Sequence, residues 1–138
     1  MADKIDVLRS VSLFRDLDNR ELQRVARLAE EVDLPSGKVL MRQGERGAEM
    51  FVLVTGAARV DLDGRELKTL GPGSVLGEMA LLSEGPRTST VTLVEPAKVL
   101  VLAHREFHTL MEDVPEVRKC IVDEMARRLR YLEADKPN

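Results

Sequence analysis

The spacing of apolar residues changes twice along the chain, and these changes divide it into three parts. Residues 5–32 carry apolar side chains every three or four positions, which predicts helices, and Asp18 or Asn19 is the expected N-cap before Glu21. Residues 33–103 instead carry short apolar runs interrupted by Gly, Pro or Asp, which predicts strands. Helical spacing returns over residues 104–134. We therefore expect a single domain over residues 1–138, with a β-roll between N-terminal and C-terminal helices.

The middle part of the chain is expected to form short strands joined by turns. The predicted strands cover residues 31–34, 38–42, 50–55, 59–62, 66–70, 88–94 and 98–102. Asp63-Gly64 lies between two alternating segments and predicts a hairpin, because a type I′ turn needs positive φ at both central residues. Short strands with turns this close together are typical of a small sandwich, barrel or jelly roll. The expected fold class is α+β, mainly β, with a double-stranded β-helix or jelly roll flanked by helices.

One segment inside the strand region does not have the pattern of a strand. Residues 78–82 are strong helix formers directly after Gly77, so a short helix is expected whose first N–H groups face an anion. A turn then brings Arg87 into the next strand, where a buried guanidinium needs an anionic partner such as phosphate. Glu78 is an acceptor suited to a sugar hydroxyl. These residue types indicate either a ribose phosphate site or an ordinary surface ion pair between Glu78 and Arg87.

The segment over residues 76–90 carries two recognisable motifs, Gly77-Glu78-Met79-Ala80-Leu81-Leu82 and Pro86-Arg87-Thr88-Ser89-Thr90-Val91. These motifs resemble the phosphate-binding cassette of the cyclic nucleotide-binding domain family. That family includes the catabolite activator protein, the regulatory subunits of cyclic AMP-dependent kinase and cyclic nucleotide-gated channels. The resemblance extends over nearly the whole chain, from a helical motif at Leu13-Phe14 to the last helix at Pro115.

The resemblance implies a role for the residues of the cassette. Glu78 would bind the ribose 2′-hydroxyl and Arg87 the exocyclic phosphate oxygens, while backbone amides complete the anion site. The expected ligand-binding residues are Gly77, Glu78, Met79, Ala80, Arg87, Thr88 and Ser89. Leu76 stands where the family often has an aromatic residue, which changes the packing beside the base but leaves phosphate capture intact.

The resemblance also bears on the base of the nucleotide. In the family a hydroxyl directly after the arginine can bond guanine, and Thr88 stands there, yet Ser or Thr also occurs there in members that respond to cyclic AMP. Cyclic AMP is therefore the expected ligand and cyclic GMP the alternative. In members of this kind the last helix caps the base, and the candidate lid residues here are Arg128, Leu129, Tyr131 and Leu132. Their alternative role is the ordinary packing of a helix.

Composition and charge argue against several other functions. The 138 residues carry a net charge of −3, with 43% hydrophobic and 33% charged residues, so the chain has no general basic footprint for nucleic acid or an anionic membrane. A single cysteine, no signal peptide and no membrane-length apolar run predict a cytoplasmic protein without membrane insertion. No kinase loop, catalytic triad or metal-ligand spacing is found, and His104 and His108 are expected at the surface or in packing. We expect neither an enzyme nor a cofactor other than the nucleotide.

The expected function is that of a sensor that passes ligand occupancy through its terminal helices to an effector protein or to a second copy of itself. Ligand binding would bias the last helix between an outward and an inward position. Only a few residues follow that helix, so neither a DNA-reading helix-turn-helix nor direct DNA binding is expected. Two alternatives are a regulatory domain of a longer enzyme, channel or transcription factor, and a degenerate module that binds a protein but no nucleotide.

Overall fold

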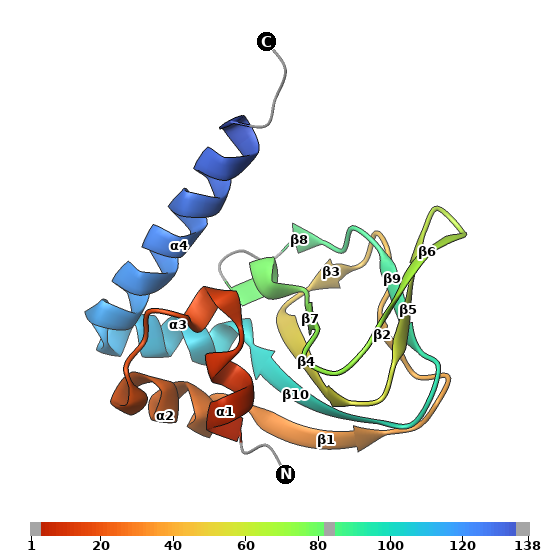
Figure 1. Ribbon diagram of the computed structural model, residues 1–138, viewed down its shortest axis with the longest axis horizontal. Helices are drawn as coiled ribbons and strands as arrows, with labels where there is room; N and C mark the ends of the chain where they lie inside the picture. Colours follow the sequence, from red (N-terminus) through yellow and green to blue (C-terminus); the bar gives the residue numbers. More distant parts are fainter. Residues whose placement is uncertain (1–3, 82–84, 135–138) are drawn as a thin grey trace.

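The structure is a computed structural model that describes residues 4–81 and 85–134, and it consists of a β-roll with a layer of helices at one end (Figure 1). The helical elements are α1 (Lys4–Arg9), the 3-10 turn η1 (Ser12–Phe14), α2 (Asn19–Leu28), the 3-10 turn η2 (Glu78–Leu81), α3 (His104–Asp113) and α4 (Pro115–Ala134). In Figure 1, α1, α2 and α3 lie together beside the roll, and α4 extends away from it. None of the described helices is long and apolar enough to cross a membrane.

The strands of the described residues pair antiparallel in three sheets. Their bounds are β1 (Glu30–Leu34), β2 (Val39–Met41), β3 (Arg46–Gly47), β4 (Glu49–Thr55), β5 (Ala58–Leu62), β6 (Arg65–Leu70), β7 (Val75–Leu76), β8 (Gly85–Pro86), β9 (Thr90–Leu93) and β10 (Ala97–Ala103). The first sheet has the order β1-β10-β4-β7, the second has the order β2-β9-β5-β6, and β3 pairs with β8. The predicted fold class, a mainly β roll flanked by helices, is confirmed.

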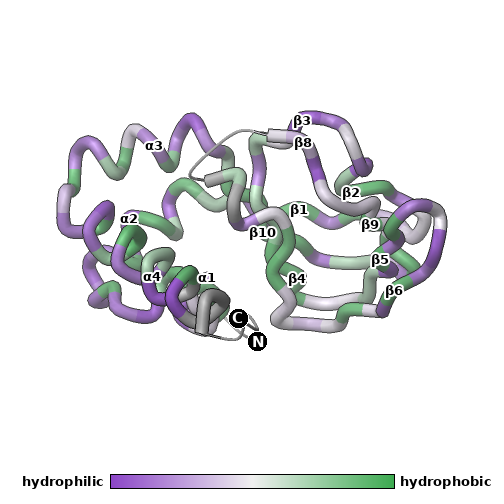
Figure 2. The backbone as a smooth tube through the Cα atoms, turned by 90° about the horizontal axis from the view of Figure 1, so that it is seen from above, coloured by the Kyte–Doolittle hydropathy of each residue, from purple (hydrophilic) through white to green (hydrophobic). Residues whose placement is uncertain are grey.

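Strand β4 separates two hydrophobic clusters and contributes to both of them. Phe51 and Leu53 pack inside the roll, whereas Met50 and Val52 pack on the opposite side with the helices. Successive side chains of a strand point to opposite faces, so a strand buried on both faces needs a continuous apolar run. Figure 2 shows β4 and β10 as hydrophobic segments between the helical layer and the outer strands of the roll.

The N-terminal helices are shorter than the apolar spacing predicts. Helix α2 ends at Leu28 and β1 begins at Glu30, so the end of the predicted helical range 5–32 is in fact strand. The reason is tertiary, because pairing with β10 overrides a local helical pattern. The predicted start of α2 is confirmed: the Glu21 N–H donates to Asp18 Oδ1 at 2.8 Å, and the Asp18 N–H donates to Glu21 Oε1 at 2.9 Å.

The predicted hairpin at Asp63-Gly64 is also confirmed, and a glutamine fastens it to the rest of the roll. The two turn residues have φ values of 53° and 80° and join β5 to β6. Gln43, in the loop before β3, donates from Nε2 to Asp63 Oδ1 at 2.8 Å and accepts from the Asp63 N–H at 2.9 Å. The Gln43 N–H in turn donates to Thr90 Oγ1 at 3.0 Å, so one residue links three segments of the roll.

Candidate functional site

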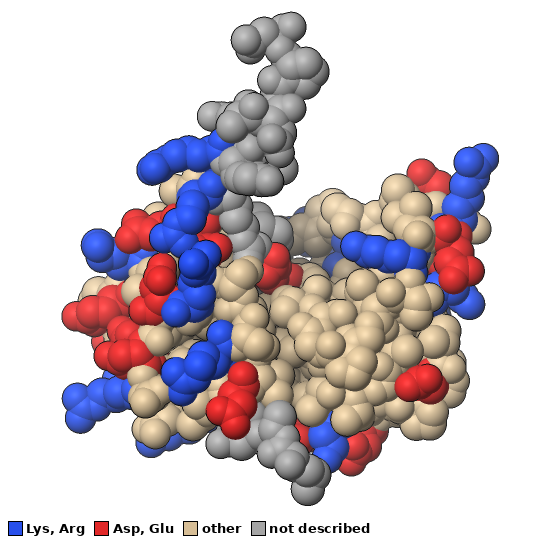
Figure 3. Space-filling model, in the orientation of Figure 1, with Lys and Arg blue, Asp and Glu red and all other residues tan. Residues whose placement is uncertain are grey.

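A cavity of about 630 Å³ opens in the roll beside η2 and β8, within the size range of small-molecule sites. The larger apolar side chains of its lining come from strands and are Met41, Val60, Leu70, Val75 and Leu76. The polar part consists of Lys68, Ser74, Glu78, Arg87, Thr88 and Ser89. In Figure 3 charged side chains gather over the helices and the β5–β6 end, while the visible face of the roll between them is mainly uncharged.

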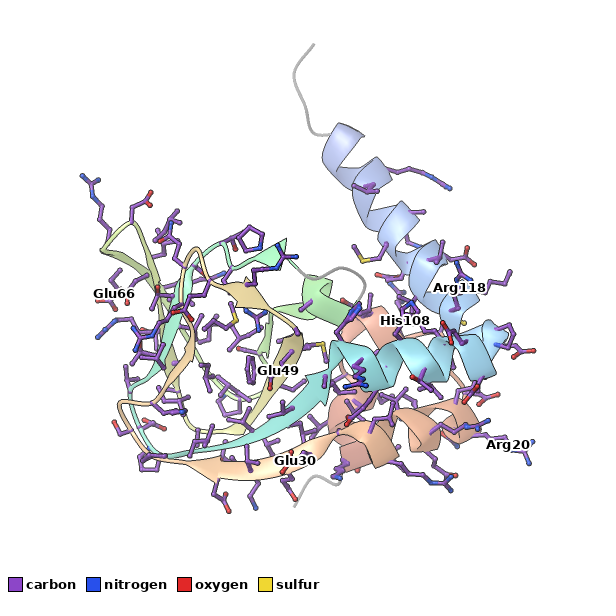
Figure 4. The ribbon with its side chains drawn as sticks, turned by 180° about the vertical axis from the view of Figure 1, so that it is seen from behind. Arg20, Glu30, Glu49, Glu66, His108 and Arg118 are labelled. Atoms are coloured by element: carbon purple, nitrogen blue, oxygen red, sulfur yellow. The ribbon has the colours of Figure 1, made fainter. Side chains whose placement is uncertain are left out.

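Arg87 lies at the polar end of this cavity, where backbone groups hold it. Its Nη2 donates to Glu49 O at 2.8 Å, and its Cζ lies 5.8 Å from the centroid of the Phe51 ring. The Arg87 N–H donates to Glu45 O at 2.8 Å, and Arg87 O accepts from the Gly44 N–H at 2.9 Å. Figure 4 labels Glu49 on β4, at the boundary between roll and helices. Both the backbone and the side chain of Arg87 are therefore fixed.

The electrostatic state of Arg87 follows from its burial. Desolvation lowers the pKa of the guanidinium, and the nearby Glu49 carboxylate partly opposes this shift. A guanidinium nevertheless stays charged at neutral pH. No ion pair joins Arg87 to Glu78 among the described residues, so the predicted alternative of a simple pair between them is not what the structure adopts. The cavity thus has a half-buried cation at one end.

Arg87 does not lie in a strand, contrary to the sequence prediction. It lies in the connection between β8 and β9, and β9 begins only at Thr90 although the predicted strand covered residues 88–94. Gly85 and Pro86 are paired with β3 in the small third sheet. The chain must therefore cross from that sheet to the second sheet, and Arg87 lies in the crossing segment.

The predicted short helix at residues 78–82 is a single 3-10 turn, η2. The Ala80 N–H donates to Gly77 O at 3.0 Å and so closes this turn instead of facing the cavity. One such turn also carries little of the dipole of a longer helix. The expected helix is therefore a shorter 3-10 turn, and the contribution of its N–H groups to anion binding stays a prediction. Leu82, at the end of the predicted helix, lies outside the described residues.

Two glycines make room for the Arg87 side chain. A Cβ atom at Gly47 would lie 1.9 Å from Arg87 Nε, and a Cβ atom at Gly77 would lie 2.4 Å from Arg87 Nη1. Gly77 also has a φ of 69°, which favours glycine. Gly47 is not among the predicted site residues, because its approach to Arg87 depends on the pairing of β3 with β8.

The structure brings most of the predicted ligand-binding residues to the cavity. Those that line it are Gly77, Glu78, Ala80, Arg87, Thr88 and Ser89. Leu76, predicted to lie near the base, is buried and also lines it. The side chain of Met79 lies outside the described part of the structure. The lining residues on β2, β5 and β6 were not predicted from the sequence, since these strands are distant in sequence from the cassette.

Among the described residues, none of α4 lines the cavity. Leu129, one of the predicted lid residues, is 59% exposed. The side chains of the other three, Arg128, Tyr131 and Leu132, lie outside the described part of the structure. Arg127 Nη2 lies 3.4 Å from Asp16 Oδ2, next to η1, which holds this part of α4 against the N-terminal helices. The helix is therefore in an outward position.

One of the two histidines, His104, connects η2 to α3. His104 begins α3, and its Nδ1 lies 2.7 Å from Ala80 O, so the ring donates to the carbonyl of the η2 turn. The His104 and His108 ring centroids lie 5.7 Å apart, and His108 contacts Glu112 on the next turn at 3.3 Å. Their predicted role in packing fits these contacts.

Known proteins are similar to this chain over most of its length. The cyclic nucleotide-binding domain family matches residues 31–114. A cyclic AMP receptor protein of Thermus thermophilus is 36% identical over 121 residues, covering 77% of this chain and 55% of that protein. A CRP-like cAMP-activated global transcriptional regulator of Mycobacterium tuberculosis is 25% identical over 130 residues, covering 91% of this chain and 58% of that protein. The chain therefore spans about half the length of these curated relatives.

One solved structure is similar to nearly the whole of this chain. The N-terminal domain of a transcriptional regulator from Streptomyces coelicolor A3(2) matches with a TM-score of 0.85 at 34% identity. The match covers 94% of this chain and 94% of that one. The likeness therefore includes the helices on both sides of the roll as well as the roll itself.

Proposed function

This chain belongs to the cyclic nucleotide-binding domain family, and we propose that it is a sensor module that binds cyclic AMP in preference to cyclic GMP in the cavity beside Arg87. The single observation that carries the proposal is the half-buried guanidinium of Arg87 at the end of an apolar-lined cavity. Burial has already removed part of its hydration, so a bound anion replaces contacts with water that the cation has lost. A cyclic phosphate diester is such an anion.

The phosphate would lie against the guanidinium edge that faces the cavity. One of the five N–H donors of the guanidinium bonds Glu49 O, which fixes its orientation and leaves further donors for phosphate oxygens. Two parallel charge-assisted bonds are the usual geometry of such a contact. The glycines at positions 47 and 77 support this assignment, because a side chain at either position would fill the space that the guanidinium occupies.

The ribose would lie beside Glu78. This residue begins η2, is half-buried and lines the cavity together with Arg87. A carboxylate only accepts hydrogen bonds at neutral pH, so it suits a sugar hydroxyl and is unsuited to a phosphate. We propose Glu78 as the partner of the ribose 2′-hydroxyl and Thr88 and Ser89 as flanking polar contacts. The backbone N–H of Ala80 is less suited than expected, since it closes the η2 turn.

Two observations bear on the choice of nucleotide. Both curated relatives described above carry cyclic AMP in their names, which supports cyclic AMP as the first ligand. Thr88 is exposed at the cavity, where its hydroxyl can donate to or accept from either purine. We therefore propose cyclic AMP as the preferred ligand and cyclic GMP as a weaker one.

Occupancy would pass to the helices through the contact between η2 and α3. The hydrogen bond from His104 to Ala80 O joins the turn that carries Glu78 to the first residue of α3. Helix α3 packs in turn on α2 and α4, within the cluster that contains Phe107 and Ile121. A shift of η2 on ligand binding thus displaces α3, and we propose that α4 then moves from its outward position over the base.

The partner that responds to this movement would be an effector protein or a second copy of the chain, acting in the cytoplasm. The relatives are regulators, and we propose a binding role without catalysis. Since the chain spans only about half their length, no activity that lies in the rest of these relatives is carried over to it, and we propose no direct DNA binding. The alternative is a regulatory domain within a longer enzyme, channel or transcription factor, or a module that contacts proteins and binds no nucleotide.

Isothermal titration calorimetry of the purified chain tests the proposed ligand. We expect cyclic AMP to bind more tightly than cyclic GMP, and 5′-AMP to bind much more weakly than either. The ring of the cyclic ester fixes the phosphate beside the ribose, so Arg87 and Glu78 can be contacted together, whereas a free 5′-phosphate rotates away. Absence of binding by both cyclic nucleotides at millimolar concentration would contradict the proposal and favour the protein-contact module.

The close approach of Gly47 to Arg87 gives a second test of the site. We expect Gly47→Ala to weaken cyclic AMP binding by about tenfold or more, because the new methyl group displaces the guanidinium. Gly71→Ala is the matched control: the same atoms are added where no other group lies within 4 Å. Equal affinities of the two variants would show that the position of the Arg87 side chain does not govern binding.

A further inference from the structure

The two histidines of the chain lie one turn apart on α3 and share one side of that helix. His104 and His108 are four residues apart, the spacing at which side chains are neighbours on a helix surface. Their ring centroids lie 5.7 Å apart at an interplanar angle of 40°. His108, labelled in Figure 4, is exposed, and His104 is partly exposed. Two imidazole rings are therefore neighbours at a surface outside the cavity beside Arg87, which neither of them lines.

Both rings use the Nδ1 atom for a contact with an acceptor. His104 Nδ1 lies 2.7 Å from Ala80 O, and His108 Nδ1 lies 3.3 Å from Glu112 Oε1. A carbonyl oxygen and a carboxylate accept hydrogen bonds and donate none, so Nδ1 carries the proton in each ring. In a neutral imidazole with its proton on Nδ1, the other nitrogen, Nε2, keeps its lone pair. The two contacts therefore fix the same tautomer in both histidines.

The Nε2 atoms of both rings are available to a ligand. Within residues 4–81 and 85–134 neither Nε2 takes part in a hydrogen bond or ion pair. A histidine that binds a metal ion almost always donates its other ring N–H to a backbone carbonyl, a carboxylate or water, which orients the ring and raises its basicity. His104 has a carbonyl in that position and His108 has a carboxylate. The spacing of the two histidines alone does not distinguish a metal site from a packed surface, but these two partners do.

We infer that His104 and His108 bind one divalent transition-metal ion, Zn²⁺ or an ion of similar preference, through their Nε2 atoms. Imidazole suits Zn²⁺, Cu²⁺ and Ni²⁺, whereas Mg²⁺ and Ca²⁺ prefer oxygen ligands. A Zn–N bond of about 2.0–2.1 Å would place the ion roughly 3 Å from the centroid of each ring. Centroids that lie 5.7 Å apart are therefore within the span of two ligands of one ion.

The proposed metal site has two protein ligands and is independent of the nucleotide site. Among the residues that the structure describes, no three histidine, cysteine or acidic side chains cluster in a way that could hold a metal ion. Water would therefore complete the coordination, and the affinity would be lower than at a structural zinc site with four protein ligands. A bound ion would hold both rings in the tautomer with the proton on Nδ1, and so would preserve the bond from His104 to Ala80 O.

Calorimetric titration of the untagged chain with zinc chloride tests this inference. We expect saturable binding of one Zn²⁺ per chain and no binding of Mg²⁺. His108→Gln removes one of the two ligands, so the Kd for Zn²⁺ is expected to rise about tenfold or more. His104→Asn is expected to have the same effect, although the asparagine amide can still donate to Ala80 O. Urea unfolding of each variant without metal checks that it is folded.

Three further variants show whether the two histidines act as the inference requires. Glu112→Gln leaves both ligands in place but removes the carboxylate that orients His108, and is expected to raise the Kd about tenfold. Glu106→Gln is the matched control, because this exposed residue of α3 lies two positions from each histidine and does not share their side of the helix. Cys120→Ser tests the single thiol as a competing ligand. Both of these variants are expected to bind Zn²⁺ as the unmodified chain does.

Nitrogen-15 NMR of the imidazole rings identifies the atoms that bind the ion. We expect Zn²⁺ to shift the Nε2 signals of both histidines while Nδ1 stays protonated. Absence of saturable Zn²⁺ binding by the unmodified chain overturns the inference. So does an affinity that is retained in both histidine variants, or one that is lost in Cys120→Ser instead. None of these results bears on the nucleotide site, because the metal titrations contain no nucleotide.

Discussion

Replacing Arg87 by alanine is expected to weaken cyclic AMP binding by about 2–5 kcal/mol, the cost of removing one member of a buried, hydrogen-bonded charge pair. The guanidinium is half-buried and oriented by Glu49 O, so little reorganisation is needed when the phosphate arrives. Without the guanidinium, the phosphate would lose its contacts with water on entering the cavity and would find no cation there at the position of Arg87. Calorimetric titration at a fixed salt concentration measures the difference.

Two further variants show whether position or charge is responsible. Arg46→Ala removes one positive charge from the neighbouring strand β3, at an exposed residue outside the main cavity, and is expected to change affinity by less than about 0.5 kcal/mol. Arg87→Lys keeps the charge but loses the planar fork, so an intermediate affinity is expected. An Arg87→Ala protein that binds as tightly as Arg46→Ala would rule out the phosphate role of Arg87.

Replacing Phe107 by alanine is expected to lower the free energy of unfolding by about 3–5 kcal/mol, because a large side chain is removed from a close-packed core. Phe107 is fully buried on α3, and its ring centroid lies 5.8 Å from that of Phe14 in η1 at an interplanar angle of 55°. The pair joins the two ends of the chain across the helical layer. Urea unfolding at 25 °C, fitted for both midpoint and slope, measures the loss.

Matched substitutions distinguish packing at Phe107 from a general effect of mutation in the helices. Phe107→Leu keeps much of the volume and is expected to cost about 1.5 kcal/mol or less. Val122→Ala shortens an apolar side chain that is already exposed on α4, so its expected cost is below about 0.5 kcal/mol. A loss below 1 kcal/mol for Phe107→Ala would contradict the proposed importance of the aromatic contact.

The features of the fold that were predicted correctly depend on local sequence. The capping of α2 by Asp18 and the hairpin at Asp63-Gly64 each involve residues within a few positions of one another. The strands β3, β7 and β8 were not predicted, because two residues carry no periodic signal and their pairing is with distant strands. The early end of α2 at Leu28 was missed for the same reason, since the pairing of β1 with β10 decides it.

The same difference between local and long-range features applies to the candidate site. The residues of the cassette are close in sequence, so Glu78 and Arg87, which both line the cavity, could be proposed as site residues from their motif. Gly47 and Lys68 could not, because one depends on the pairing of β3 with β8 and the other on the register of β6 with β5. The lid over the base stays a prediction. It concerns the helix α4, which in this structure contacts Asp16 next to η1.

Gln43 imposes a condition on any attempt to alter the cavity of this protein by exchanging its β5–β6 hairpin. Its side chain holds Asp63 in the β5–β6 turn from the loop that leads to Gly47, and its backbone N–H holds Thr90 at the start of β9. The hairpin that carries Lys68 is thereby braced to the segments that frame Arg87. A grafted hairpin would need a partner for Gln43 at the position of Asp63, or the two ends of the cavity would lose their common alignment.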